Sequence, residues 1–429
     1  MSKRYILLII LFLGLLFRVI IGFHNYHYDA TNHMIWGEDA AKHGLPGFYE
    51  RTSANYPPLT TLTFSFIFFI KDYIYRLNWL SNIQIPFFPP NFNYYSLLIK
   101  LPAIISDIGI AYVTYLFIQR IIRNKKSVWP IIASLFILFN PAYFYNSAYW
   151  GQVDSMPLFF VLVSFYLLIF TNKSVHSGVA FTFALLSKQT AVVFLPLFLL
   201  LFLKKSKAKQ IIITLASSFI IFISFFIPFY RSGNIILYPF ITYWNKILTV
   251  SGLFYTSNHA FNFWYLLTGS MKIEASAKYL FNMSYELWGY AITGLINVFV
   301  LIKLIKRKFQ PHDVIFAGTL IPFSAFFFLT KMHERHLIIA LPFLLIVFFT
   351  IYHPESYEIG QGFRRLILSS FVYLSLFNFL NMYHNWWSPE IPILIHVLSS
   401  TLIINLLTSL VFGVFVLLFK NYLKQDRIL

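Results

Sequence analysis

Long hydrophobic runs separated by short polar segments recur along almost the whole chain. An apolar run of about 20 residues is long enough to cross a membrane as a helix. We expect about 12 such crossings, in a range of 11 to 13, near residues 5–22, 97–119, 128–147, 156–171, 175–187, 190–203, 210–229, 285–304, 312–330, 336–352, 366–382 and 393–419. The pattern predicts an all-α polytopic membrane protein in which residues 1–429 form one integral unit.

Three of the apolar segments are short for a membrane crossing. Residues 175–187 and 190–203 are expected to form a broken pair that meets inside the protein at "SKQT". The segment "PPLTTLTFSFIFFI", residues 57–70, is read as a re-entrant or interfacial helix, because a crossing there would move "QRIIRNKK" to the exterior. It would belong to a long exterior loop, 23–96, and a second exterior loop would cover 230–284; a crossing by 57–76 stays open as the alternative.

The charge of the chain is low in amount and uneven in placement. Only 11% of residues are charged, against about 25% in soluble proteins. The net charge of +18 lies mostly in short basic runs between apolar segments, which is typical of cytoplasmic loops and excludes a nucleic-acid partner. With a cytoplasmic N-terminus, 20 Lys and Arg residues fall on cytoplasmic segments and 11 on exterior ones. We therefore expect a multi-pass cell-membrane protein with both termini in the cytoplasm.

Two further features limit the chemistry. Cysteine is absent, which excludes disulfides and thiolate metal sites. The apolar stretch after the charged N-terminal residues is too long for a signal peptide, so we expect it to be retained as the first crossing.

In this topology the unusual polar residues gather at the exterior surface, as expected for one active site built from several loops. Asp29 follows the first crossing and is the candidate general base. Lys188, Arg335 and His336 are candidates for holding a phosphate leaving group. The candidates for contacting sugar or acceptor are Trp36, Tyr56, Trp150, Gln152, Gln189, His259, Asn262, His333 and Glu334.

Each of these assignments has a structural alternative. Asp29 precedes a helical run and is equally suited to cap it. Asp107, in the middle of a crossing, is expected to pair with Lys100 or to stabilise an internal helix contact. Asp39 and Glu38 suit a solvated helix face. The interfacial aromatic residues, Trp264, Trp386 and Trp387 among them, can equally be membrane anchors. His333 and His336 lack a third partner at metal-ligand spacing.

Six motifs in one order carry a resemblance to a known family: "YD…W…G…FY…NYPPL", "KLPAIISDI", "NP…YWGQVDS", "SKQTAVVFLP", "SNHAFNFWYLL" and "KMHERHLIIALP". The chain resembles the GT-C superfamily of integral membrane glycosyltransferases over roughly residues 20–345. It is most similar to the prokaryotic group related to the second mannosyltransferase of GPI-anchor assembly. It is also similar to the dolichyl-phosphate-glucose-dependent glucosyltransferases of N-glycan assembly.

The resemblance implies a transferase that uses a polyprenyl-phosphate sugar donor and acts on a glycan or glycolipid acceptor outside the cytoplasm. It assigns Asp29 as catalytic base, places Asp154 in the site, and directs Arg335 with His336 toward the donor phosphate. A single displacement would invert the sugar. Mannose or another hexose is expected, with no cofactor, although a divalent metal stays open. The alternative function is a transporter or flippase of lipid-linked sugars, which internal repeats and mid-membrane polar residues would have favoured.

Overall fold

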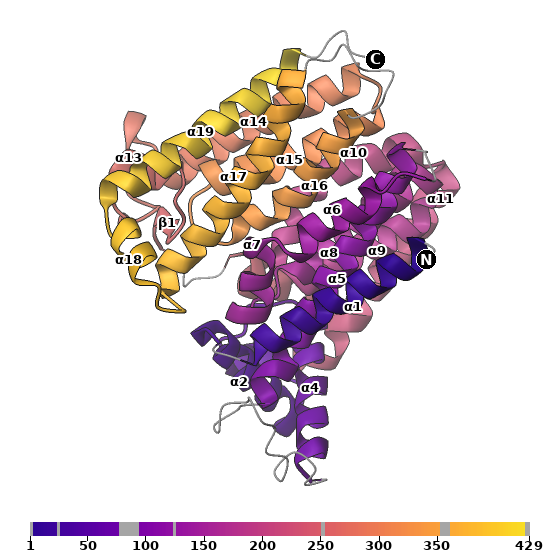
Figure 1. Cartoon of the computed structure of the whole chain (residues 1–429). Coiled ribbons are helices and arrows are strands. Elements are labelled where there is room, and N and C mark those ends of the chain that lie inside the picture. Colours follow the sequence, from indigo (N-terminus) through magenta and orange to yellow (C-terminus); the bar gives the residue numbers. More distant parts are fainter. Residues whose placement is uncertain are drawn as a thin grey trace.

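The computed structural model describes residues 3–23, 26–76, 94–122, 126–249, 254–351 and 361–424. They form a bundle of helices with one small parallel sheet (Figure 1). The α-helices are α1 (Lys3–Gly22), α2 (Tyr28–Lys42), α3 (Phe48–Arg51), α4 (Pro58–Arg76), α5 (Tyr94–Ile122), α6 (Trp129–Leu138), α7 (Pro141–Phe144), α8 (Ser155–Tyr166), α9 (Ser174–Ser187), α10 (Leu195–Lys205), α11 (Ala208–Phe226), α12 (Tyr238–Thr242), α13 (Phe263–Thr268), α14 (Tyr285–Lys306), α15 (Pro311–Phe328), α16 (Leu341–Ile351), α17 (Gln361–Trp386), α18 (Pro392–Leu398) and α19 (Thr401–Lys424). The strands are β1 (Ser257–Asn258) and β2 (Met332–His333). Tighter or wider helical turns are η1 (Tyr145–Trp150), η2 (Leu167–Thr171), η3 (Gln189–Phe194), η4 (Ile227–Phe229), η5 (Tyr243–Leu248), η6 (Leu280–Asn282) and η7 (His336–Ala340).

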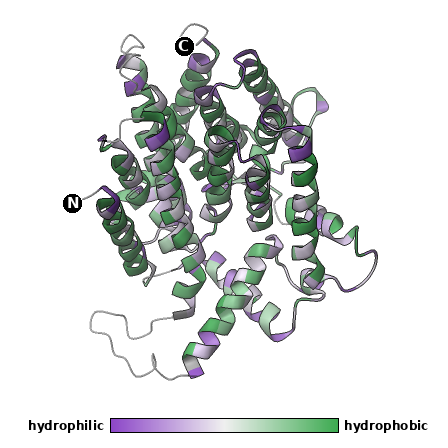
Figure 2. Cartoon of the chain, turned by 90° about the vertical axis from the view of Figure 1, so that its right-hand side faces the viewer, coloured by the Kyte–Doolittle hydropathy of each residue, from purple (hydrophilic) through white to green (hydrophobic). Residues whose placement is uncertain are grey.

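The chain is an all-α polytopic membrane protein, as the hydrophobic pattern predicts. Seven of the described helices are long and apolar enough to cross a membrane: α1, α5, α11, α14, α15, α17 and α19. An eighth candidate is the bent pair of 129–138 and 141–150, and shorter apolar helices cover Ser155–Thr171, Ser174–Ser187 and His336–Thr350. Each of the twelve expected segments therefore contains a helix, although fewer than twelve qualify by length and composition. Figure 2 shows hydrophobic residues dominating the long helices.

The segment expected at 128–147 is not one straight helix. Its two halves meet at an angle of 42°. Asn140 ends the first half and caps α7, because its side chain accepts a hydrogen bond from the Ala142 amide at 3.0 Å. Pro141 then occupies the first position of α7, where the missing N–H is harmless. The Asn-Pro pair thus produces the bend that the apolar pattern alone did not reveal.

The predicted break between 175–187 and 190–203 is confirmed. Helix α9 ends at Ser187, Lys188 has extended backbone angles, and a 3-10 turn leads into α10. A helix interrupted in this way offers polar backbone and side-chain groups inside the protein, where a continuous apolar helix would not.

Helices α2 and α4 form a separate lobe at the lower end of the bundle in Figure 1. They approach closely at Gly37, where a Cβ atom would lie 2.7 Å from the Phe64 carbonyl oxygen. Helix α4 is not among the seven crossing candidates. It exposes Phe66, Phe69 and Tyr73 at helical spacing, which suits an interfacial helix. The two exterior loops stay predictions, and residues 24–25, 77–93 and 250–253 in them lie outside the described residues.

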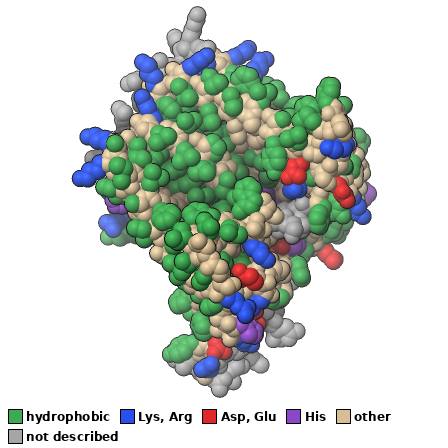
Figure 3. Space-filling model, turned by 180° about the vertical axis from the view of Figure 1, so that it is seen from behind, with side chains coloured by type: hydrophobic (Ala, Val, Ile, Leu, Met, Phe, Trp, Pro, Cys, Tyr) green, Lys and Arg blue, Asp and Glu red, His purple; other side chains and the backbone are tan. Residues whose placement is uncertain are grey.

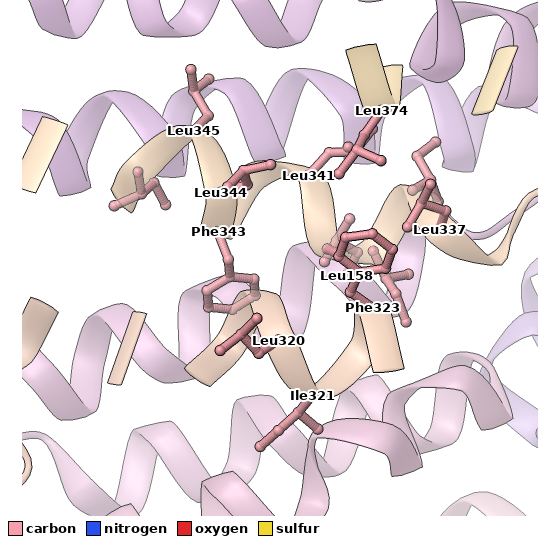
Figure 4. Close-up of a cluster of buried hydrophobic side chains, with 14 of the residues drawn as sticks. Leu158, Leu320, Ile321, Phe323, Leu337, Leu341, Phe343, Leu344, Leu345 and Leu374 are labelled. Carbon is pink, nitrogen blue, oxygen red and sulfur yellow. The ribbon is translucent and has the colours of Figure 1, made fainter. Parts of the chain in front are cut away.

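The main core lies where α15 and α16 pack against α8 and α17. Helix α15 is buried over almost its whole length. Its Leu320 faces Phe343 and its Phe323 lies near Leu337 of the 336–351 segment, whereas Ile321 points away from that segment (Figure 4). A second core joins the α2–α4 lobe to α11 and α12. The two cores hold the lobe and the bundle on either side of the charged site described below.

Asp107 has a different partner from the one expected. It pairs with Arg18 of α1, whose Nε lies 2.8 Å from Oδ2, and both side chains are fully buried. Lys100 instead donates to the Gly22 carbonyl at 3.2 Å. The expectation of a Lys100 partner is therefore wrong, because the spacing within one helix does not reveal a partner 89 residues away on another. The structural role expected for Asp107 stands.

Charged side chains are distributed unevenly over the surface. Figure 3 shows a broad hydrophobic face, with Lys and Arg gathered along its upper left margin. Acidic side chains and histidines are visible on the lower lobe and at the right margin. A basic end and a wide apolar belt suit a helical bundle that spans a membrane with its basic end in the cytoplasm.

Cysteine labelling can test this orientation, because the chain has no cysteine of its own. Ala208 is exposed at the start of α11, on the side expected to be cytoplasmic, and Ser276 is exposed in the second expected exterior loop. In intact cells an impermeant maleimide should label Ser276→Cys but not Ala208→Cys. Permeabilised cells should give labelling of both. The reverse pattern in intact cells would invert the topology.

Candidate active site

Asp29 lies in the first turn of α2 and is held through one oxygen. Oδ2 accepts hydrogen bonds from Trp150 Nε1 at 2.9 Å and Gln152 Nε2 at 2.5 Å. The same oxygen lies 3.3 Å from His27 Nδ1 and 3.8 Å from Arg335 Nη1. In the described part of the chain nothing bonds to Oδ1, and the side chain is 25% exposed. One carboxylate oxygen is therefore anchored and the other is left available.

The N-cap of α2 is His27, not Asp29. The His27 side chain accepts from the Asp29 amide at 3.2 Å. It also stacks on Trp150, with 4.1 Å between ring centroids. The capping alternative for Asp29 is therefore wrong, and the acid is free of the role that most often explains Asp before a helix.

Asp154 is a fully buried carboxylate between two cations. Lys188 Nζ lies 2.7 Å from its Oδ1, and Arg335 Nε lies 3.5 Å from its Oδ2. Asn146 adds a long hydrogen bond to Oδ2 at 3.4 Å. The turn that brings Asp154 here depends on Gly151, whose φ of 93° is unfavourable for other residues. A Cβ on Gly151 would also lie 2.9 Å from that of Ala30.

Lys188 projects from the break between α9 and the following 3-10 turn. Besides Asp154 it contacts Gln152 Oε1 at 3.3 Å, and its Nζ lies 5.0 Å from the centre of the Tyr56 ring. The Tyr56 hydroxyl donates to the same Gln152 oxygen at 3.0 Å. Gln152 thus accepts from Tyr56 and Lys188 and donates to Asp29, so it joins the two halves of the site.

Arg335 lies among three carboxylates. Its Nη1 is 2.6 Å from Glu334 Oε1, in addition to its contacts with Asp29 and Asp154. The segment is fixed by the pairing of β1 with β2 and by Asn378 of α17, which donates to the Glu334 carbonyl at 2.7 Å. The guanidinium is 8% exposed, and the Glu334 side chain is fully buried.

The structure brings Asp29, Asp154, Lys188 and Arg335 into one network, although they are far apart in sequence. Three carboxylates, those of Asp29, Asp154 and Glu334, face the basic side chains of Lys188 and Arg335 there. Burial acts to raise the pKa of Asp29, but His27 and the charge of Arg335 outweigh it and hold the pKa well below its usual range. Burial likewise opposes ionisation of Asp154, and Lys188 and Arg335 outweigh it, so its pKa is also lowered.

The neighbouring histidines are kept neutral. Burial lowers the pKa of His33 to about 3, an effect to which Lys188 and Arg335 add. Burial also lowers the pKa of His333. His33 lies one helical turn after Asp29 and stacks on Phe64 at 4.8 Å. Burial therefore disfavours the charged form of both histidines, and the cations that contact Asp154 are Lys188 and Arg335.

Most of the other candidate residues lie at the network of charged groups. Trp36, Tyr56, Trp150, Gln152, His333 and Glu334 lie at or next to the network. Gln189 follows Lys188, and its buried Oε1 has no partner among the described residues. His336 contacts Met332 Sδ at 3.3 Å rather than an acid.

The loop before α13 contributes in a different way. Asn262 caps α13 through the Tyr265 amide at 3.2 Å, which gives it a structural task. His259 is bridged to His333 beside the sheet, and its carbonyl accepts from Asn381 at 2.7 Å. Neither side chain is hydrogen-bonded to Asp29 or Asp154 within the residues described. The structure thus places both on the border of the network and not within it.

Two residues close to the site, His27 and Asn146, escaped sequence reasoning. The only signal for His27 was its position two residues before an acid at a helix start. Trp386 of α17, considered above among the interfacial aromatic residues, also lies here: its ring is 5.4 Å from that of His27 and 5.6 Å from that of Trp150. Glu38 and Asp39 form surface pairs with Lys42 and Arg51, as expected of a solvated face.

A polytopic helical bundle with a buried carboxylate and cation network at the ends of its helices is the architecture expected of a membrane-embedded glycosyltransferase. Comparison with protein families agrees: the sequence model of glycosyltransferase family 87 matches residues 55–302, more than half of the chain. The chain belongs to glycosyltransferase family 87. A comparison with curated proteins finds no match. The matched region contains Asp154 and Lys188, whereas Asp29 and Arg335 lie outside it.

The buried pair of Lys188 and Asp154 generates a stability prediction. Lys188→Met should lower the free energy of unfolding by about 3 kcal/mol, the lower end for an uncompensated buried charge, because Arg335 remains beside Asp154. Adding Asp154→Asn should recover much of that loss. Apparent melting temperatures of the purified protein in detergent measure both effects. A double variant less stable than Lys188→Met would show that the pair is not coupled.

Proposed function

We propose that this protein transfers a single sugar, mannose or another hexose, from a polyprenyl-phosphate donor to a lipid-linked or cell-surface glycan acceptor on the exterior face of the membrane. Membership of a glycosyltransferase family supports transfer over transport. The resemblance to polyprenyl-phosphate-dependent enzymes supports the donor class. The observation that carries the mechanism is Asp29, with one oxygen anchored and the other available beside two buried cations.

The proposed reaction is a single displacement. Asp29 Oδ1 takes the proton of an acceptor hydroxyl, and that oxygen attacks the anomeric carbon of the donor sugar. The bond between that carbon and the phosphate oxygen breaks, and the bond to the acceptor oxygen forms on the opposite face. The sugar is therefore inverted, and the electron pair leaves with the lipid phosphate. Trp36, Tyr56 and Trp150 would provide apolar surfaces for the sugar.

The two cations are already paired, which has a consequence for donor binding. Lys188 and Arg335 contact Asp154, Glu334 and Asp29 at distances of 2.6 to 3.8 Å. A phosphate would have to share or displace these carboxylates to reach the cations. When phosphate draws Arg335 away from Asp29, the pKa of Asp29 rises toward its usual range and the acid becomes a better base. Donor binding would thus prepare the base for the acceptor.

No metal ligand is assigned. Within the residues that the structure describes, no group of three or more His, Asp or Glu side chains is arranged to hold a metal ion. In the proposed reaction the charge that develops on the leaving phosphate is balanced by Lys188 and Arg335.

The positions of the two ends of the helices support the exterior location. The site lies next to the C-terminal end of α1 and the N-terminal ends of α8 and of the turn that leads into α10. Basic residues mark the opposite ends, with Lys3 in α1 and Lys204 and Lys205 in the last turn of α10. If that basic end faces the cytoplasm, the site faces the exterior.

The substrate proposal is tested with membranes from cells that express the protein. A panel of synthetic polyprenyl-phosphate sugars, each radiolabelled in the sugar, is offered to native membrane lipids and glycans. Transfer from at least one lipid donor, and none from the matching nucleotide sugar when lipid-donor synthesis is blocked, is the expected result. Transfer from the nucleotide sugar alone under that block would refute the donor class.

The role of Asp29 is tested by Asp29→Asn, which keeps the size of the side chain but cannot take a proton at neutral pH. Transfer should fall by ~10² or more, the usual contribution of a general base. Expression and donor binding should survive, because Lys188 and Arg335 are unchanged. Initial rates with a saturating donor measure the loss.

Asp39→Asn is the matched control, since Asp39 lies on the same helix and pairs with Arg51 at the surface. It should retain near-normal transfer. If Asp29→Asn keeps its activity while Asp154→Asn abolishes transfer, the base is Asp154 and not Asp29.

A further inference from the structure

We propose that Asp107, inside the bundle and outside the site, is a positioning residue that holds the segment 145–155 in the geometry that transfer requires. This inference rests on the proposed function, since that segment supplies Trp150, Gln152 and Asp154. Asp107 touches none of these three side chains directly. Its effect would pass through two serines that flank the segment's functional residues.

The contacts of Asp107 use both carboxylate oxygens. Oδ2 accepts from Arg18 Nε at 2.8 Å and from the Ser147 hydroxyl at 2.6 Å. Oδ1 accepts from the Ser155 hydroxyl. All four side chains are at most 1% exposed. A single carboxylate on α5 thus ties together α1, η1 and the start of α8.

The two serines are placed next to residues of the site. Ser147 follows Asn146, and Ser155 follows Asp154. Asn146 closes the segment on itself, because its side chain donates to Asp154 and its carbonyl accepts from the Gln152 amide at 2.9 Å. Both ends of the loop that presents Trp150 and Gln152 to Asp29 are therefore fixed to Asp107. The loop cannot shift along α5 without breaking one of the two hydroxyl contacts.

Arg18 holds Asp107 in place through a buried ion pair. Besides the ion pair, its Nη1 donates to the Leu138 carbonyl at 2.7 Å, on the last residue of α6. A charge-assisted hydrogen bond donated to a buried carboxylate is stronger than one between neutral groups. Asp107 therefore accepts stronger hydrogen bonds from the two serines than Asn would. The pair is a rigid point to which the loop is attached.

The alternative is that this network stabilises the fold and nothing more. The two roles predict different effects when the serine hydroxyls are removed and the ion pair is kept. A structural role lowers the melting temperature and leaves the turnover of the folded enzyme unchanged. A positioning role lowers turnover, because small displacements of catalytic groups have large effects on rate.

The test uses Ser147→Ala/Ser155→Ala in the full-length enzyme. We expect kcat to fall by about 10-fold to 100-fold. The KM for the lipid donor should change less than about threefold, because Lys188 and Arg335 lie on other segments. Ser134→Ala is the matched control: Ser134 is also fully buried beside α5, but its hydroxyl donates only to the carbonyls of Ala111 and Pro130. It should leave kcat unchanged.

A second readout does not depend on activity. Ala148 lies in the segment 145–155, is fully buried and is not a candidate for contacting substrate. Ala148→Cys therefore reports on the packing of the loop. Maleimide labelling of this cysteine should be slow with both serines present. Removal of the two hydroxyls should speed it by at least about 10-fold, as expected when a local segment opens more often. Labelling of Ala148→Cys in the Ser134→Ala background should stay slow.

Normal kcat together with unchanged labelling in the double serine variant would overturn the proposal. If the double variant does not fold, the single variants Ser147→Ala and Ser155→Ala are judged by the same two readouts. Absence of transfer by the wild-type enzyme from every lipid donor would count against the proposed function. The labelling rates would then still decide whether Asp107 tethers the segment.

Discussion

Ionised side chains that leave water must find partners, and this requirement organises the molecule. The free energy of burying an unpaired charge is unfavourable by several kcal/mol. The buried carboxylates Asp107, Asp154 and Glu334 each contact a cation within 2.8 Å. The first two pairs, and the contact of Arg335 with Asp154, join segments that are remote in sequence, so they fix how α1, α5, α9 and the segment around Arg335 meet. The helices supply the apolar surroundings, and the ion pairs determine the register.

The site combines residues from the segment matched by the family model with residues that precede and follow that segment in the sequence. The matched segment supplies Asp154, Lys188 and the loop with Gln152. Asp29 comes from the α2 lobe before the matched segment, and Arg335 from the residues between β2 and η7 after it. Asn378 and Asn381 of α17 brace that later half by binding the backbone at Glu334 and His259. The C-terminal helices therefore contribute to the geometry of the site, although they carry no motif.

The sequence predicted most of what depends on local pattern. Apolar runs located the helices, and the short pair around Lys188 revealed its break. Charges near the ends of apolar segments made Asp29, Lys188 and Arg335 candidates, and the family resemblance added Asp154. Contacts between distant segments had no such signal. Lys100 is spaced to meet Asp107 on one helix, yet Arg18 is the true partner, and the Asn140-Pro141 bend lay hidden in an apolar run. The pattern likewise gave no sign that Asn262, a predicted binding residue, caps a helix.

Gln152 imposes a direction on the site. Its Oε1 faces the ammonium of Lys188 and the hydroxyl of Tyr56, while its Nε2 faces the carboxylate of Asp29. The amide dipole is therefore aligned with the field between a positive and a negative group, and a flipped amide would oppose that field at both ends. Glutamate has the same shape but would present a charged acceptor to Asp29 in place of the donor. Glutamate, the residue closest to Gln152 in shape, is therefore the substitute that the site tolerates least. Gln152→Glu would test the polarity of the side chain and not its size.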